Sequence, residues 1–151
     1  MESTVRLQAA GTPQPQPTSR SVRKQLQQLV ALEYGLMDAC HEAARMATQE
    51  DLAMLADWAG ATQVHLFDLG TALRDLGDET PSYSRCMRQA LLQSGNHRQA
   101  CARLERAYER VLERTDMHDG LRTLLRANLM DHRGFMAGSR VSTFSPMRSA
   151  A

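Results

Sequence analysis

The sequence predicts an all-α fold, an antiparallel up-down four-helix bundle. Between residues 19 and 138 the only proline is Pro81, and helix interiors tolerate proline poorly. The same region is rich in Ala, Leu, Arg, Glu and Gln, which are strong helix formers. Its apolar residues recur at alternating steps of four and three, the stripe of a bundle helix. Helices of about 18 to 28 residues joined by short connections pack in antiparallel fashion.

Composition predicts the domain boundaries. Residues 1–18 end in the segment GTPQPQPT, which cannot bury enough apolar surface to offset the entropy of ordering it. These residues are predicted to form a disordered N-terminal arm, and residues 139–151 a flexible C-terminal tail. Residues 19–138 are predicted to form the four-helix bundle, because a chain of this length builds a single hydrophobic core.

The first helix is predicted to run from Ser19 or Ser21 to Ala47. Its seam is apolar except for one glutamate, Glu33. The seam positions are Val22, Leu26, Leu29, Glu33, Leu36, Cys40, Ala43 and Ala47.

The second helix is predicted to begin at Thr48, which with Asp51 resembles a capping box, and to end at Gly77. One seam position is Thr62, and His65 lies on the flank of the seam. The seam positions are Leu52, Leu55, Ala59, Thr62, Leu66, Leu69, Leu73 and Leu76.

The third helix is predicted to be broken into two pieces. Thr80 and Pro81 are suited to the N-cap and first position of a short helix that ends near Gln93. Residues 94–96 interrupt it, and a longer piece runs from His97 to Arg114. Its inward positions are Cys101, Leu104, Tyr108, Val111 and Leu112, with Glu105 beside them.

The fourth helix is predicted to begin near Thr115 or Asp116. Two of its seam positions, Asn128 and His132, are polar. The seam positions are Leu121, Leu125, Asn128, His132 and Phe135.

The polar exceptions in the four seams lie near the middle of their helices. In an antiparallel bundle with aligned ends, these midpoints lie at one height, so the exceptions are predicted to form a single polar layer. A buried carboxylate is costly unless it is paired, hydrogen-bonded or bound to a metal. The layer comprises Glu33, Thr62, His65, Glu105, Asn128 and His132.

Three interpretations of this layer remain open. A divalent metal (iron, manganese or zinc) would be held by carboxylates and imidazoles, which suit such ions. Alternatively, a hydrogen-bonded network fixes helix register, in which case Glu33→Leu is expected to be tolerated or stabilising. In the third interpretation, an exposed His65 accepts a phosphoryl group. The proposed metal ligands are Glu33, His65, Glu105 and His132.

The spacing around His65 resembles that of the ferritin-like superfamily, and in particular small uncharacterised bacterial four-helix bundles similar to bacterioferritin and rubrerythrin cores. In these proteins a second-helix histidine is followed by a leucine and a turn with glycine and proline. Here Leu76 follows eleven residues after His65 and opens LGDETP. The broken third helix, the segment LEYGLMDACHEAA and the position of His132 also resemble that group.

The resemblance implies a di-metal centre built from two single glutamates and two Glu-x-x-His motifs. Thr62 and Leu129 stand where the two motif glutamates belong, and Asn128 offers only a neutral amide oxygen. The resemblance therefore implies a degenerate site. Its four remaining ligands, two carboxylates and two histidines, are enough in number for one tetrahedral or open metal site.

The expected function is that of a non-enzymatic, stress-associated or protein-binding bundle, with no catalytic or cofactor-binding residue assigned. The partner is expected to be a second copy of the chain or another protein. One alternative is an oxidase or ferroxidase-like protein with Tyr108 or Tyr34 near one or two metals; another is histidine phosphotransfer through His65. Apolar residues left over from the core are expected to form the interface: Met37, Met46, Met54, Trp58, Phe67 and Met130.

Charge and cysteine content narrow the function classes. The 18 Lys and Arg residues nearly balance the 17 Asp and Glu residues, which argues against nucleic-acid binding. No apolar run approaches the roughly 18 residues that span a membrane. The three cysteines show no CxxC spacing, so reduced thiols and a cytoplasmic location are expected.

Overall fold

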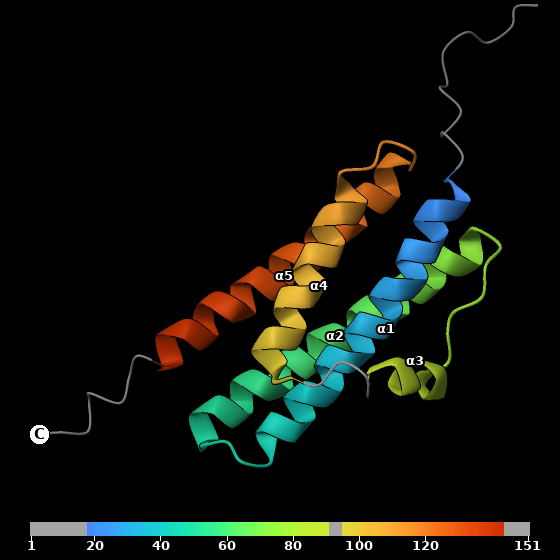
Figure 1. Ribbon diagram of the computed structural model, residues 1–151. Coiled ribbons are helices and arrows are strands. Elements are labelled where there is room, and N and C mark those ends of the chain that lie inside the picture. The colour runs from blue at the N-terminus through green and yellow to red at the C-terminus, as the bar shows by residue number, and fades with distance from the viewer. Residues whose placement is uncertain (1–17, 91–94, 144–151) are drawn as a thin grey trace, which may run out of the picture.

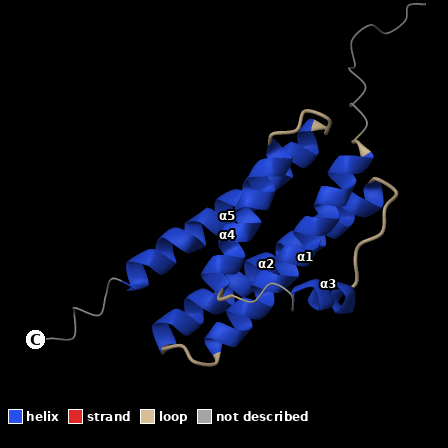
Figure 2. Cartoon of the chain, in the orientation of Figure 1, coloured by secondary structure: helices blue, strands red, loops and turns tan. Residues whose placement is uncertain are grey.

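The computed structural model describes residues 18–90 and 95–143, and within these residues every regular element is a helix (Figures 1 and 2). The prediction of an all-α fold is confirmed. The predictions for most of the N-terminal arm and for residues 144–151 lie outside the described residues. The helices are α1 (Arg20–Ala44), α2 (Gln49–Asp75), α3 (Tyr83–Ala90), α4 (His97–Leu112) and α5 (Asp119–Thr143).

The four longer helices pack side by side. Helix α1 contacts α2 and α4, and α5 also contacts α2 and α4. In Figure 1, α1 and α5 run in one direction along the bundle while α2 and α4 run in the other. Each of these contacts therefore joins two antiparallel helices.

The caps of α1 and α2 lie where the sequence predicts them. Ser19 Oγ accepts a hydrogen bond from Val22 N at 3.1 Å, and Thr48 caps α2 in the same way. After α2, Gly77 has a φ of 75°, a left-handed conformation that favours glycine. Gly77 N donates to Arg74 O and Asp78 N donates to Leu73 O, each at 2.9 Å. These two bonds form a Schellman motif, which ends the helix.

Helix α3 does not form the first half of the third bundle helix, so the predicted broken helix is wrong in this respect. Because α2 and α4 run in the same direction, the chain must return along the bundle before α4 begins. The connection follows α1, and α3 packs against α1 as part of it. The contacts along this path are Arg23 Nη1 to Leu76 O at 3.4 Å, Gln27 Nε2 to Glu79 O at 3.3 Å and the Tyr83 hydroxyl to Asp38 Oδ2 at 2.9 Å.

Helices α3 and α5 begin later than predicted, because different residues cap them. Ser82 Oγ accepts from Arg85 N at 3.3 Å, so α3 begins at Tyr83 rather than at Pro81. His118 Nδ1 accepts from Leu121 N at 3.1 Å, so α5 begins at Asp119.

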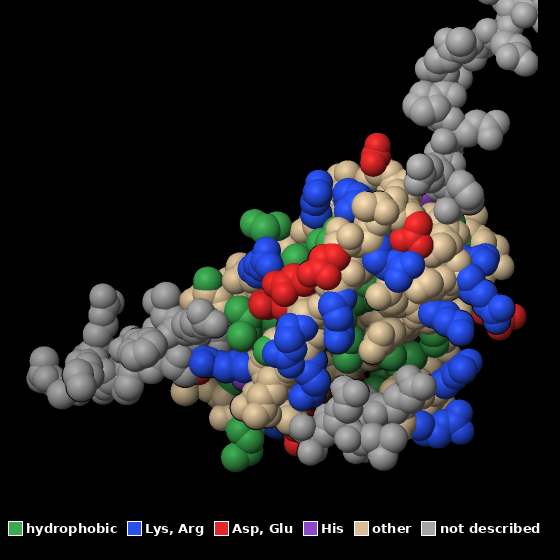
Figure 3. All heavy atoms as spheres, turned by 45° about the horizontal axis from the view of Figure 1, so that its top comes forward, with side chains coloured by type: hydrophobic (Ala, Val, Ile, Leu, Met, Phe, Trp, Pro, Cys, Tyr) green, Lys and Arg blue, Asp and Glu red, His purple; other side chains and the backbone are tan. Residues whose placement is uncertain are grey.

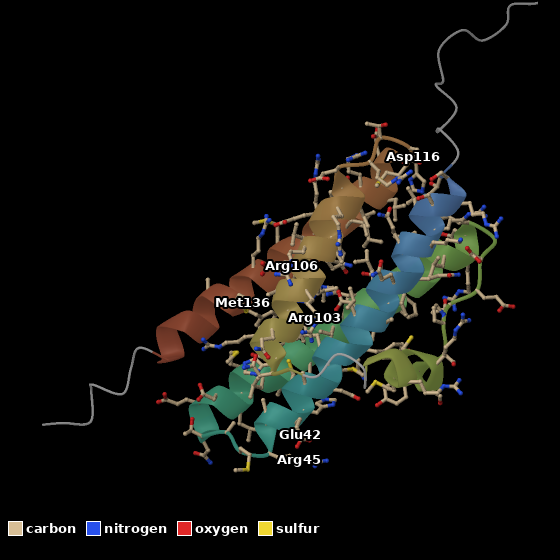
Figure 4. The ribbon with its side chains drawn as sticks, in the orientation of Figure 1. Glu42, Arg45, Arg103, Arg106, Asp116 and Met136 are labelled. Atoms are coloured by element: carbon tan, nitrogen blue, oxygen red, sulfur yellow. The ribbon has the colours of Figure 1, made fainter. Side chains whose placement is uncertain are left out.

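The ends of the bundle also differ from prediction in two places. Helix α1 ends at Ala44, before the predicted Ala47. Helix α5 continues to Thr143, so the predicted flexible tail at Ser139 begins too early. Figure 4 marks one end of the bundle with Glu42 and Arg45 at the α1–α2 turn, and the opposite end with Asp116 between α4 and α5.

The apolar seams meet along the bundle axis and form the core. Trp58 and Tyr108 are the largest fully buried side chains. The prediction that Trp58 is left over for an interface is therefore wrong; its ring stacks on Phe135 with centroids 5.5 Å apart. Other core residues are Leu26, Leu29, Leu36, Leu69, Leu73, Leu104, Leu121 and Leu125.

The surface carries both signs of charge. Lys and Arg side chains lie near Asp and Glu side chains on the face that Figure 3 presents, with hydrophobic side chains between them. Among the described helices, none has the length and apolar character required to cross a membrane.

Candidate functional site

The predicted polar layer exists and is centred on Glu33, which α1 places in the core with no exposed surface. Glu33 Oε1 accepts a hydrogen bond from the Tyr108 hydroxyl of α4 at 2.6 Å and one from His132 Nε2 of α5 at 2.8 Å. His65 Nδ1 of α2 lies 3.1 Å from the same oxygen. Each of the four long helices thus contributes one side chain to this contact.

Three further residues contact this centre from outside. Trp58 Nε1 donates to His132 Nδ1 at 3.2 Å, and Asn128 Nδ2 donates to the Tyr108 hydroxyl at 3.2 Å. Asp131 Oδ2 lies 2.9 Å from His65 Nε2, and its side chain is 57% exposed, so it links the buried centre to the surface. We call the whole set the Glu33 network: Glu33, Trp58, His65, Tyr108, Asn128, Asp131 and His132.

The indole of Trp58 fixes the tautomer of His132. An indole nitrogen can only donate, so His132 Nδ1 must be the acceptor. The proton of the neutral imidazole then lies on Nε2, which points it at Glu33 Oε1. Asn128 orients the Tyr108 hydroxyl in a similar way. Its amide N–H donates to the hydroxyl oxygen, so the hydroxyl proton is directed at Glu33.

His65 lies between two carboxylates, and its imidazolium form donates to both. Burial alone lowers the pKa of His65, but the hydrogen bond and the charge of Glu33 raise it, as do those of Asp131, and the net pKa is raised. An imidazolium has two N–H donors, which match the acceptors at Nδ1 and Nε2. Charge-assisted bonds of this kind are stronger than neutral ones.

Glu33 is held as a carboxylate by its partners. Burial alone raises the pKa of Glu33, but the hydrogen bonds from His132 and His65 lower it, and the net pKa is lowered. Burial, together with the nearby Glu33 charge, keeps the pKa of Tyr108 well above its ordinary value. The Tyr108 hydroxyl therefore stays protonated and remains a donor to Glu33.

Three of the four predicted metal ligands are brought together. One ligand atom each from Glu33, His65 and His132 lies within 4.8 Å of the others, so this buried group could hold a metal ion. The distances are 2.8 Å and 3.1 Å from Glu33 Oε1 to the two imidazoles, and 3.2 Å between His65 Nδ1 and His132 Nε2. A metal with bonds of about 2.0–2.2 Å holds neighbouring ligand atoms about 3.0–3.5 Å apart.

A ferritin-like di-metal centre does not fit these residues. Glu105 lies outside the group, half-buried, where Cys101 Sγ contacts its carboxylate at 3.8 Å. The Thr62 hydroxyl donates to Ala59 O at 2.7 Å within its own helix, and Leu129 is a buried core residue. A single carboxylate, Glu33, therefore remains in the group, whereas two metal ions require several carboxylates to neutralise them.

Sequence reasoning missed the roles of Trp58 and Asp131. Trp58 lies seven residues before His65, on the same face of α2. A buried indole N–H requires a partner, and this requirement is the signal that could have assigned Trp58 to the polar layer. Asp131 precedes His132 and was not predicted to contribute; it reaches His65 from the edge of α5.

The three cysteines and His65 are inaccessible to solvent. Cys40, Cys86 and Cys101 are free and buried, and burial raises the pKa of Cys40 to about 12. High thiol pKa values make these cysteines unreactive. His65 is 1% exposed and both ring nitrogens contact network residues, which argues against phosphotransfer.

Comparison of the chain with protein-family models, with curated proteins and with solved structures finds no match. The resemblance to ferritin-like proteins therefore remains a prediction from the residues quoted above.

Proposed function

We propose that the protein is a non-enzymatic bundle of ferritin-like topology, in which a hydrogen-bonded network takes the place of the metal centre and which functions by binding protein. Support for the topology comes from the contacts of α1 and α5 with both α2 and α4. The long connection between α2 and α4 also supports it, because ferritin-like bundles have one long crossover.

The observation that carries the proposal is the direction of the hydrogen bonds in the Glu33 network. Three donors converge on Glu33 Oε1: the Tyr108 hydroxyl, His132 Nε2 and, in its imidazolium form, His65 Nδ1. A metal bound to this oxygen would displace protons that now satisfy it. The network therefore compensates the buried charge without an ion.

We expect the purified wild-type protein to contain substoichiometric metal after growth with added iron, manganese or zinc. Added metal should leave the unfolding temperature unchanged, because a ligand stabilises only the state that binds it. A site with a Kd 100-fold below the added concentration would stabilise the fold by about 2.7 kcal/mol, a shift that thermal denaturation detects. Elemental analysis showing one metal per chain that His65→Ala removes would overturn the proposal.

A second candidate function is a mononuclear metal centre with oxidase or ferroxidase-like activity. Two histidines and one carboxylate are a ligand set used by non-haem iron enzymes. Glu33 Oε2 favours this candidate, because it is buried and has no hydrogen-bond partner within the described residues. A buried carboxylate oxygen without a hydrogen-bond partner is available to coordinate a metal ion. The elemental analysis above distinguishes the two candidates.

Exposed apolar side chains on α2 support a protein-binding role. Val64 is 58% exposed and Phe67 is 70% exposed, and residues three apart lie on the same face of a helix. Beyond the adjoining backbone of α2, no described atom lies within 4 Å of where a Cβ of Gly60 would stand, one turn before Val64, so the face is open there. Exposed apolar patches are typical of interaction sites. We propose that this face of α2 binds a second copy of the chain.

We expect Phe67→Ser to weaken self-association measured by sedimentation velocity over a range of protein concentrations. The serine removes the largest exposed apolar side chain from the α2 face. Met46→Ser is the matched control, because Met46 is 91% exposed but lies at the α1–α2 turn. Equal association of all three proteins, or a monomeric wild type, would exclude this surface as the dimer contact.

A further inference from the structure

Each imidazole of the Glu33 network has one nitrogen beside Glu33, the inner nitrogen, and one that faces away from it, the outer nitrogen. The outer nitrogen of one histidine faces a hydrogen-bond acceptor, and that of the other faces a donor. His65 Nε2 faces the carboxylate of Asp131, an acceptor, at 2.9 Å. His132 Nδ1 faces the indole N–H of Trp58, a donor, at 3.2 Å. The inner nitrogens, His65 Nδ1 and His132 Nε2, lie 3.2 Å apart beside Glu33 Oε1.

Metal coordination imposes a requirement on the outer nitrogen. A histidine that binds a metal through one nitrogen carries its proton on the other, and that N–H donates to a carboxylate, a carbonyl or water. His65 meets this requirement, because its Nε2–H would donate to Asp131 while the unprotonated Nδ1 coordinated the metal ion. His132 does not meet it, because its outer neighbour donates.

We propose that Trp58 keeps this site free of metal by holding His132 in the tautomer that carries its proton on Nε2. This inference rests on the proposed function. A divalent transition metal such as zinc at His132 Nε2 would force the proton to Nδ1, where it would face the indole N–H. Two buried donors would then lose their acceptors, which is costly in a core.

The surroundings of Trp58 prevent its indole from turning away. The side chain has no exposed surface, and its ring stacks on Phe135 at 5.5 Å with an interplanar angle of 11°. The His97 ring packs against it at an interplanar angle of 89°, with the two ring centroids 5.6 Å apart. The donor therefore stays aimed at His132. Without this donor, Glu33, His65 and His132 retain a spacing that suits one metal ion.

The test compares zinc affinity between the wild type and Trp58→Phe. Phenylalanine keeps an aromatic ring against Phe135 and removes the N–H, so the outer nitrogen of His132 is free to carry the proton. We expect zinc to bind Trp58→Phe at least about tenfold more tightly, measured by competition with a chromophoric chelator, since outer partners of metal ligands change affinity by about 10–100-fold. Equal zinc affinity of the two folded proteins would overturn the inference.

The double variant Trp58→Phe/His132→Ala is the matched control. It should lose the gain in zinc affinity if His132 is the ligand that Trp58 withholds. A gain that persists in the double variant would mean that zinc binds elsewhere, and this result would also overturn the inference. Circular dichroism establishes that each variant is folded before the comparison.

Nitrogen-15 NMR of the wild-type histidines gives a second measurement that needs no variant. We expect the His132 ring to show a protonated Nε2 and an unprotonated Nδ1. A proton on Nδ1 would overturn the role of Trp58, even if Trp58→Phe failed to fold. Stoichiometric zinc in the wild type together with the Nε2–H tautomer of the metal-free protein would instead overturn the proposed function, so the two failures are distinguishable.

Discussion

Replacing Glu33 by leucine is expected to destabilise the protein by about 3–5 kcal/mol, the range found when one partner of a buried charged pair is removed. The substitution removes the acceptor of Tyr108 and His132, which are buried and have donors directed at Oε1. It also removes the carboxylate that forms an ion pair with the His65 imidazolium. Urea denaturation of the wild type and the variant measures the difference in the free energy of unfolding.

Two variants separate this effect from a general intolerance of substitution. Glu105→Leu makes the same change on α4, outside the network, and should cost less, because its half-buried carboxylate accepts a weak S–H hydrogen bond from Cys101 rather than a set of strong donors. Glu33→Gln keeps an oxygen acceptor but removes the charge, and should fall between the two. A loss below about 1 kcal/mol for Glu33→Leu would mean that the network contributes little to stability.

This expectation reverses the one drawn from sequence. A buried charge on a helix seam is often replaceable by an apolar residue, and sequence alone does not show how many donors depend on it. The structure assigns three donors to one oxygen of Glu33. Replacing the acceptor alone leaves these donors unsatisfied, whereas only simultaneous replacement of all partners would restore an apolar core.

The helix periodicity predicted the fold class and most of the polar layer, but not the partners within it. Periodicity locates a residue on a face, and aligned midpoints locate it to about one turn along the bundle. A precision of one turn is enough to predict that Glu33, His65 and His132 lie together. It is not enough to predict whether Glu105 or Tyr108 of α4 contacts Glu33. These two residues lie three positions apart on α4, and Tyr108 is the one that reaches Glu33.

The path of the chain between α2 and α4 was harder to predict for a different reason. A short amphipathic helix after Pro81 is compatible both with a broken bundle helix and with a helix in a crossover. The deciding contacts, such as Tyr83 with Asp38, join residues far apart in sequence. Composition and spacing carry no information about such pairs, so the predicted third helix in two pieces was the part of the fold that failed.

The pH dependence of stability is expected to show a maximum that His65 and Glu33 create together. The pKa of Glu33 is lowered from 4.5 in the folded protein, so its contribution is present above pH 4.5 and is lost as the pH falls through the lowered value. The pKa of His65 is raised from 6.5, so its contribution is present below pH 6.5 and is lost as the pH rises through the raised value. Both contributions to stability are fully present between pH 4.5 and pH 6.5.

The His65→Gln variant isolates this effect. The groups that face His65 are Glu33 from α1 and Asp131 and His132 from α5, and all remain in the variant. We expect the excess stability of the wild type over the variant to be largest between pH 4.5 and 6.5. The excess should shrink as the pH rises above this window, when His65 loses its charge, and as the pH falls below it, when Glu33 is protonated.

Thermal denaturation of both proteins between about pH 3 and pH 9 tests this expectation, since the window lies within that range. Hydrogen bonds from Arg114 and Ser19 lower the pKa of Asp116, so acid destabilises both proteins through a group far from His65. Subtracting the two curves removes this shared contribution and leaves the part that depends on His65. Parallel curves across the whole range would mean that His65 stays uncharged in the folded protein, and the imidazolium assigned to the Glu33 network would then be wrong.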